Sequence, residues 1–183
     1  GCDKVCSDVN AKDYSDIENA VLTGAGKEAD VLFEAGVTNT LLVNADKETN
    51  GQTLYINVNG NDKNQSGKII VNVEDNVTFT IIENFKGESS TEGRVALRTL
   101  IDTGLNSKVR LIQVYMQPES IDVLSDTGCR LSDNASFEIV QVFVGRGSLY
   151  DGIRTELIGN NSAFTADIGY LGAKKQNIDI NLI

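Results

Sequence analysis

One segment of the sequence recurs four times, and this repeat constrains the fold more than any other feature. Each copy places an asparagine before a run of alternating apolar residues, and successive copies start 30, 28 and 27 residues apart, at Asn76, Asn106, Asn134 and Asn161. Nine residues after the asparagine stand Phe85, Tyr115, Phe143 and Tyr170. A period of this length is typical of a solenoid, in which each unit buries its apolar face against the next copy.

A second apolar stretch follows each copy, at residues 94–101, 119–125, 152–158 and 177–183. The last one alternates, with Ile178, Ile180 and Leu182 on one face and polar residues on the other, as a half-buried strand does. Two strands per coil of about 28 residues predict an all-β fold, a flattened parallel β-helix that is right-handed by the usual crossover preference. The aromatic columns become interior stacks, and the asparagine column marks a turn with left-handed backbone.

The chain divides into two parts. Residues 51–183 carry the repeat and its upstream strands, 51–60 and 67–74, and form the predicted β-helix core. Residues 1–50 form a short helical or irregular cap, with a capping box at Ser15 and Glu18, a helix that ends near Gly24, and a further turn or two in residues 26–36. Because the chain stops at Ile183 within a strand pattern, we expect either a truncated core or an edge that meets another chain.

Composition excludes several classes of function. The net charge is -10, which argues against nucleic acid as a partner, because binding to phosphates depends on clustered Lys and Arg. No apolar run approaches the roughly 20 residues of a membrane helix, so no bilayer span is predicted. Seventeen glycines with a single proline, Pro118, favour strands joined by turns.

Three cysteines do not make a disulfide framework. Cys2 and Cys6 form a lone C-x-x-x-C with no second half, so two terminal thiols are the plain interpretation, while a shared metal, a disulfide or a lipidated Cys2 stay open. Cys129 lies in a strand and is interpreted as a core residue. The alternative is an exposed thiolate that serves as a sulfur or iron ligand.

No catalytic or metal-binding residue is predicted. The chain has no histidine, the residue most used for acid–base catalysis near neutral pH, and no phosphate-binding loop. The glycine pairs at 24–26 and 145–148 are interpreted as turns. β-Helices also host carbohydrate lyases, but Asp151, Arg154 and Glu156 are more simply the outward face of a strand and its loop.

The last two repeats, residues 134–180, resemble the β-helical core of the SufB/SufD family of the SUF iron–sulfur cluster assembly machinery. The resemblance lies in a strand that ends in Gln-Val-aromatic, a glycine-containing loop, the turn Leu157–Ala163 of the form L-x-G-x-[DN]-S-A, a Gly-Tyr pair, and Gln176 followed by Asp179, displaced by one position. It extends more weakly back to about Gly51 and does not include residues 1–40.

Within this family the chain looks more like SufD. In the SufB branch the resemblance implies a sulfur-accepting cysteine two residues before the leucine of that turn, and Thr155 stands there. The resemblance further implies a fragment of a non-catalytic, cytoplasmic scaffold whose partners are a SufB-like scaffold and a SufC-like ATPase, with a homodimer through a β-helix edge as another arrangement. It implies no cofactor bound by this fragment and a transient iron–sulfur cluster in the full complex. The alternative is a surface-exposed or lipid-anchored β-solenoid module for adhesion or carbohydrate binding.

Overall fold

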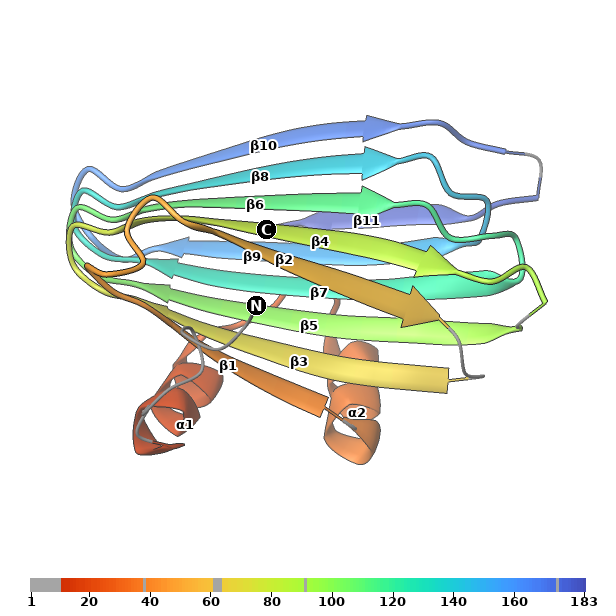
Figure 1. The fold of residues 1–183 in the computed structure, drawn as a ribbon, viewed down its shortest axis with the longest axis horizontal. Helices are drawn as coiled ribbons and strands as arrows, with labels where there is room; N and C mark the ends of the chain where they lie inside the picture. Colours follow the sequence, from red (N-terminus) through yellow and green to blue (C-terminus); the bar gives the residue numbers. More distant parts are fainter. Residues whose placement is uncertain (1–10, 38, 61–63, 91, 174) are drawn as a thin grey trace.

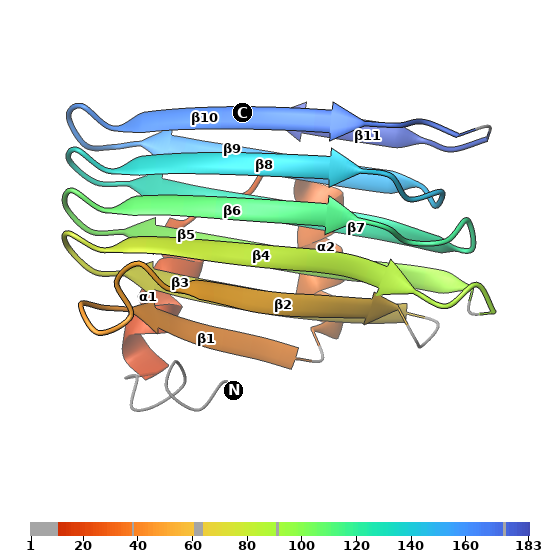
Figure 2. The same cartoon turned by 45° about the horizontal axis from the view of Figure 1, so that its top comes forward.

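The computed structural model describes residues 11–37, 39–60, 64–90, 92–173 and 175–183. Two parallel sheets face each other and form a flattened solenoid (Figures 1 and 2). Sheet A consists, in spatial order, of β1 (Asn39–Ala45), β3 (Asn64–Val73), β5 (Gly93–Thr103), β7 (Ile121–Leu131), β9 (Leu149–Leu157) and β11 (Ile178–Leu182). Sheet B consists of β2 (Thr53–Gly60), β4 (Thr78–Gly87), β6 (Lys108–Tyr115), β8 (Ser136–Phe143) and β10 (Ala163–Tyr170). The predicted parallel β-solenoid is confirmed.

The strand register reproduces the repeat found in the sequence. Phe137 of β8 pairs with Val109 of β6 on one side and with Phe164 of β10 on the other, so each strand lies one repeat away from its neighbours. Strand β1 pairs in parallel with β3, so the stack of sheet A begins upstream of residue 51.

Aromatic side chains stack in the interior between the two sheets. The ring centroids of Phe85 and Tyr115 lie 4.5 Å apart, and those of Tyr115 and Phe143 lie 4.4 Å apart. All three side chains are at most 2% exposed, whereas Tyr170 in the same repeat position is 67% exposed. Burial of each such ring stabilises the fold by roughly 1.5–3 kcal/mol.

The recurring asparagines adopt the left-handed backbone that their position predicts. Their φ angles lie between 55° and 62°, at Asn76, Asn106, Asn134 and Asn161. Asparagine tolerates this region because its short polar side chain bonds locally, and here the side chains of Asn106 and Asn76 bond to each other at 3.0 Å. In the turn at Leu157–Ala163, Ser162 Oγ donates to Gly159 O at 2.9 Å. A Cβ on Gly159 would lie 2.1 Å from the backbone nitrogen of Asp133, so only glycine fits there.

Two helices, α1 (Ala11–Ala20) and α2 (Lys27–Gly36), lie along the outer face of sheet A. They cover outward-facing apolar residues: Ile17 of α1, and Val21 directly after it, pack with Ile70 and Leu100 of the sheet. The predicted capping box is wrong, because Ser15 lies within α1 and does not precede it. The second helix confirms the further turns expected in residues 26–36.

A short segment between the helices crosses sheet A and is fixed by one buried carboxylate. Asp126 of β7 is 0% exposed, and its Oδ1 accepts hydrogen bonds from the backbone nitrogens of Gly24 and Ala25 at 3.1 and 2.8 Å. Its Oδ2 accepts from Arg98 at 2.6 Å, and Arg98 also binds Asp30 of α2. The glycines at 24–26 are therefore part of a docked segment and not only of a turn.

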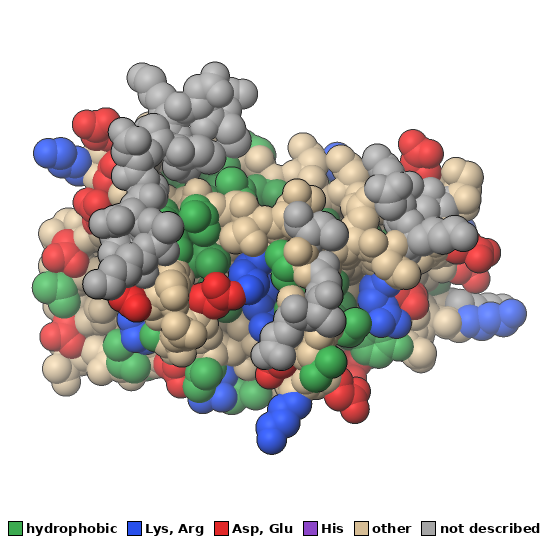
Figure 3. All heavy atoms as spheres, turned by 90° about the horizontal axis from the view of Figure 1, so that it is seen from below, with side chains coloured by type: hydrophobic (Ala, Val, Ile, Leu, Met, Phe, Trp, Pro, Cys, Tyr) green, Lys and Arg blue, Asp and Glu red, His purple; other side chains and the backbone are tan. Residues whose placement is uncertain are grey.

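The side of the molecule that carries the helices has no uniform charge. Figure 3 shows this side from below, with acidic and basic side chains interspersed among apolar ones. Lys68 of β3, for example, forms an ion pair with Glu18 of α1. Among the residues that the structure describes, neither helix has the length and apolarity to cross a bilayer.

Candidate functional site

Polar side chains from both sheets meet inside the solenoid, and we name this cluster the polar file. Its members from sheet B are Glu83, Gln113 and Gln141, which occupy one register column across β4, β6 and β8. All three are at most 1% exposed. Sheet A contributes Thr99, Ser125 and Asp151 from β5, β7 and β9. In sheet B the column is closed by Ile56 of β2 at one end and Ile168 of β10 at the other.

Hydrogen bonds connect the polar file from one end to the other. Thr99 Oγ1 donates to Glu83 Oε1 at 2.7 Å, and Gln113 Nε2 donates to Glu83 Oε2 at 2.8 Å. Gln141 Nε2 in turn donates to Gln113 Oε1 at 2.7 Å and to Asp151 Oδ2 at 2.8 Å. The file therefore has a carboxyl group at each end and two amides between them.

Tyr115 joins the polar file to the aromatic stack. Its hydroxyl donates to Ser125 Oγ at 2.9 Å, while its ring packs between Phe85 and Phe143. Burial raises the pKa of the Tyr115 phenol well above its ordinary value, and the nearby Asp151 adds to this effect. The phenol is thus a neutral donor throughout the physiological range.

Both carboxyl groups of the polar file have a raised pKa. Burial raises the pKa of Glu83, against hydrogen bonds from Gln113 and Thr99 that lower it. Burial likewise raises the pKa of Asp151 to about 7. No Lys or Arg is among the buried side chains of the described residues, so no cation offsets the cost of ionising either group.

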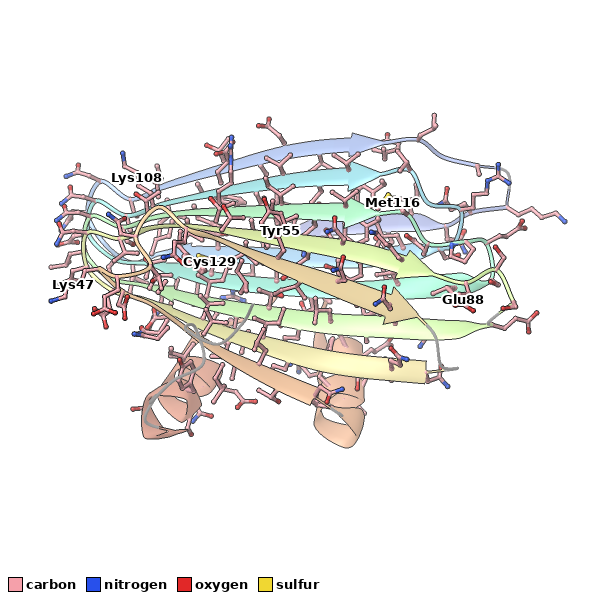
Figure 4. The ribbon with its side chains drawn as sticks, viewed as in Figure 1. Lys47, Tyr55, Glu88, Lys108, Met116 and Cys129 are labelled. Carbon is pink, nitrogen blue, oxygen red and sulfur yellow. The ribbon has the colours of Figure 1, made fainter. Side chains whose placement is uncertain are left out.

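Cys129 and Thr155 occupy neighbouring places in another interior column. They pair across β7 and β9, next to Ile101 of β5 (Figure 4 labels Cys129). Cys129 is 0% exposed and lies in the apolar core, and its burial raises the pKa of the thiol well above the ordinary value. The thiol is therefore an apolar core group and not a reactive thiolate. Thr155 has a buried Oγ1 that makes no hydrogen bond within the described residues.

The three residues considered for a lyase do not form a cluster. Arg154 and Glu156 bind each other at 3.0 Å on the outer face of β9, whereas Asp151 is buried and bonds to Gln141. The interpretation of Asp151 as outward-facing is wrong, because it shares an interior column with Ser125 of β7. No group of three or more acidic, cysteine or histidine side chains that could hold a metal ion occurs in the described ranges. Cys2 and Cys6 lie outside the described residues.

Gln176 and Asp179 differ in role. Gln176 Nε2 donates to the backbone oxygens of Gly145 and Gly147 at 3.0 and 2.8 Å, so it joins the last loop to the loop one coil earlier. Asp179 is exposed on β11. The hydrogen bonds of Gln176 explain its place in that pattern, whereas the side chain of Asp179 makes no hydrogen bond within the part of the chain that the structure describes.

A surface hollow lined by described residues is separate from the polar file. It has a volume of about 830 Å³ and lies beside the loops that follow β4, β6 and β8. Its charged lining combines Glu92 and Glu119 with Arg146, and its apolar lining includes the exposed Met116 (Figure 4). This mixed lining defines no ligand class.

The polar file was not predicted from the sequence, although the repeat contains a signal for it. Glu83, Gln113 and Gln141 each stand seven residues after the repeat asparagine, between interior positions five and nine residues after it. Side chains two apart on a strand share a face, so these three polar residues had to point inward. Their hydrogen-bond partners in sheet A could not be read from the repeat.

The fold and the polar file together define a class: a two-sheet parallel β-solenoid with a hydrogen-bonded polar interior. A comparison with family models matches residues 55–183, more than two thirds of the chain, to the SufBD core domain of SUF system FeS cluster assembly. The chain therefore belongs to the SufB/SufD family. Searches of curated proteins and of solved structures find no significant match.

Proposed function

We propose that the chain is a SufD-like, non-catalytic scaffold subunit in the assembly of iron–sulfur clusters by the SUF system. Membership of the SufB/SufD family supports a role in that system. The observation that carries the SufD-like assignment is Thr155, which lies inside the solenoid where, by resemblance, the SufB branch has its sulfur-accepting cysteine. A threonine hydroxyl cannot form a persulfide, so this position does not accept sulfur.

Cys129, the cysteine that the structure describes in the interior, does not replace the sulfur-accepting cysteine of the SufB branch. Cys129 pairs with Thr155 across the ladder, but it is fully buried and its pKa is raised, so it is a poor nucleophile. In this proposal sulfur and iron are collected on a SufB-like partner, and the cluster is a transient product of the complex. The present chain supplies a rigid shape.

Membership of the SufB/SufD family also supports the proposed partners, because the family belongs to the SUF system. A SufB-like chain is the proposed partner, a cytoplasmic complex the proposed setting, and a SufC-like ATPase the third component.

The test is co-expression of the tagged chain with SufB-like and SufC-like proteins, followed by affinity purification and mass spectrometry. Iron and acid-labile sulfide are measured in the eluate. We expect the SufB-like chain to co-purify, and iron and sulfide to appear only when it is present. A matched variant, Thr155→Cys, tests whether a thiol at this position gains sulfur. If the wild-type chain acquires sulfide and iron when expressed alone, or retains neither partner, the proposal is wrong.

A further inference from the structure

Gln141 and Asp151 form a half-completed pair. Gln141 Nε2 donates to Asp151 Oδ2 at 2.8 Å, and the two residues are 0% and 4% exposed. The other oxygen of each side chain, Gln141 Oε1 and Asp151 Oδ1, is buried and accepts no hydrogen bond from the described residues. Two bonded side chains thus each keep one unsatisfied acceptor, and an unsatisfied buried acceptor costs free energy.

A single proton on Asp151 supplies the donor that this pair lacks. A carboxylic acid donates through one oxygen and accepts through the other, and a carboxamide does the same through its nitrogen and oxygen. With the proton on Oδ1, Asp151 donates to Gln141 Oε1 while Oδ2 continues to accept from Gln141 Nε2. The two groups then form a reciprocal acid–amide pair that carries no net charge.

The groups around Asp151 favour the neutral acid. From the interior it faces Glu83 of β4, Tyr115 of β6 and Ser125 of β7, and Asp126 of β7 adds a further negative charge nearby. On β11 its register partner is the apolar Ile180. Outside the sheet, Asp151 shares the lining of a hollow with charged and polar residues of α2, β5, β9 and β11, namely Glu28, Arg94, Tyr150, Asp179 and Asn181.

The one basic residue in that group does not offset the acidic ones. Arg94 stands beside Glu28 and Asp179 in the lining, and it belongs to the outer surface and not to the interior. Asp126 is occupied by Arg98 and by the backbone of residues 24 and 25, so that guanidinium is not available to Asp151. Burial, followed by the charges of Asp126 and Glu83, raises the pKa of Asp151 to about 7, against the lowering effect of Gln141 and Ser125.

We infer that Asp151 is protonated in the folded chain at mildly acidic pH, that it donates this proton to Gln141, and that loss of the proton loosens β9 and β11. On ionisation the O–H bond breaks, its electron pair stays on the carboxylate, and the proton passes to solvent. The new charge then faces the unpaired oxygen of Gln141. Strand β11 is affected directly, because its Ile180 is the register partner of Asp151 and because, among the described strands, it pairs only with β9. The pair is a pH-sensitive switch for this end of the solenoid.

The direction of the pH effect follows from proton binding. In the unfolded chain an aspartate has a pKa of about 4, so between about pH 4 and about pH 7 only the folded chain holds the proton. Asp151 therefore makes the folded state less stable as pH rises through this window, and its effect levels off above about pH 7. Between pH 5 and pH 8 its contribution raises the unfolding equilibrium constant by roughly a hundredfold.

The test compares wild type with Asp151→Asn by urea unfolding at several pH values from 5 to 8. Asparagine reproduces the neutral pair, because its amide nitrogen donates to Gln141 Oε1 and its oxygen accepts from Gln141 Nε2. We expect the ratio of the two unfolding constants to grow by roughly a hundredfold over this range. The control, Asp167→Asn, removes the same charge from the exposed face of β10, outside the hollow that Asp151 lines, and is expected to keep the wild-type pH dependence.

Two further measurements locate the effect. Amide hydrogen exchange at pH 8 is expected to be slower in β11 of Asp151→Asn than in β11 of wild type, and equal in the two proteins in β3. The carboxyl carbon resonance of Asp151, followed by NMR in the wild-type chain, is expected to titrate near neutral pH. This NMR titration tests the inference even if Asp151→Asn does not fold. Titration of Asp151 together with the exposed aspartates, or a variant-to-wild-type ratio that does not change with pH, would overturn the inference.

Discussion

The aromatic stack and the polar file lie side by side in the same strands, yet they stabilise the solenoid in different ways. Phe85, Tyr115 and Phe143 each follow a member of the file by two residues, on β4, β6 and β8. The rings lie about 4.5 Å apart and need no partner besides each other. The file needs every donor and acceptor matched, and its two carboxyl groups make that match depend on protonation. The same backbone repeat thus carries the aromatic stack, whose contribution to stability does not depend on pH, and the polar file, whose contribution does.

The largest expected effect comes from interrupting the aromatic stack. Phe85→Ala removes a fully buried ring that stacks on Tyr115, and we expect a loss of about 3–5 kcal/mol in the free energy of unfolding. The loss is expected to be equal at pH 5 and pH 8, since no charge is involved. Urea denaturation followed by circular dichroism measures it.

Tyr55→Ala is the matched control for this substitution. Tyr55 lies on β2 of the same sheet but is 66% exposed (Figure 4), so its removal is expected to change stability by about 0.5 kcal/mol or less. Equal losses for the two variants, or a loss in Phe85→Ala that depends on pH, would show that the two columns do not differ as described.

A smaller effect is expected in the polar file. Gln141→Leu removes the donor to Gln113 and to Asp151, and leaves their oxygens buried without it. We expect a loss of about 1–3 kcal/mol at pH 8. At pH 5 the loss is expected to be at least as large, because the neutral Asp151 then also loses its acceptor, Gln141 Oε1. The control is Gln52→Leu, at an exposed surface residue, with no measurable change with pH. Stability unchanged in Gln141→Leu at both pH values would contradict the role given to the file.

The fold was predictable because the repeat and the strand alternation point to the same answer. The asparagine turn fixes where each strand starts, so the positions three, five and nine residues later fall on one face, and Phe79, Ile81 and Phe85 are indeed buried. The same logic applies to the position seven residues later, where Glu83 stands. Because Glu83 is polar, it was not predicted to be an interior residue, although the alternation of side chains along the strand places it inside.

Other features depend on contacts between distant segments and could not be predicted. Asp151 starts a stretch that reads as a polar loop, and its inward orientation becomes clear only from Gln141 on the opposite sheet. The position of the helices likewise depends on Asp126, which binds a segment about a hundred residues away in sequence. A carboxylate that fixes a distant backbone leaves no periodic trace in the sequence.

Glu83 gives a weaker test of how far the polar file depends on protonation. Its carboxylate oxygens each accept one hydrogen bond, so it lacks the unsatisfied acceptor that Asp151 has. Because burial raises the pKa of Glu83, the folded chain holds its proton to higher pH than the unfolded chain, and its contribution to stability falls as pH rises through the folded pKa. In Glu83→Gln this part of the pH dependence is expected to disappear.

At low pH Glu83→Gln is expected to be within about 1 kcal/mol of wild type. The glutamine oxygen still accepts from Gln113, and its nitrogen donates to Thr99 Oγ1. Urea unfolding across pH 4–8 measures both quantities. If the stability of Glu83→Gln changes with pH as steeply as that of wild type, Glu83 does not contribute to the pH dependence. The pH dependence then comes from other groups, of which Asp151 is the first candidate.

The smallest expected effect lies in the turn that sets the register of both columns. Asn134 has a φ of 57° and its Oδ1 accepts from Asn161 Nδ2 at 3.3 Å. Asn134→Ala puts a less tolerant side chain into left-handed backbone and is expected to cost about 1 kcal/mol, whereas Asn134→Gly is expected to cost a few tenths, since glycine adopts this conformation freely. Thermal unfolding of both variants at one pH measures the difference. If Asn134→Gly destabilises the chain as much as Asn134→Ala does, the hydrogen bonds between the asparagine side chains, and not the backbone conformation, explain the asparagine. The interior columns then depend on these hydrogen bonds at the turn as well as on those of the polar file.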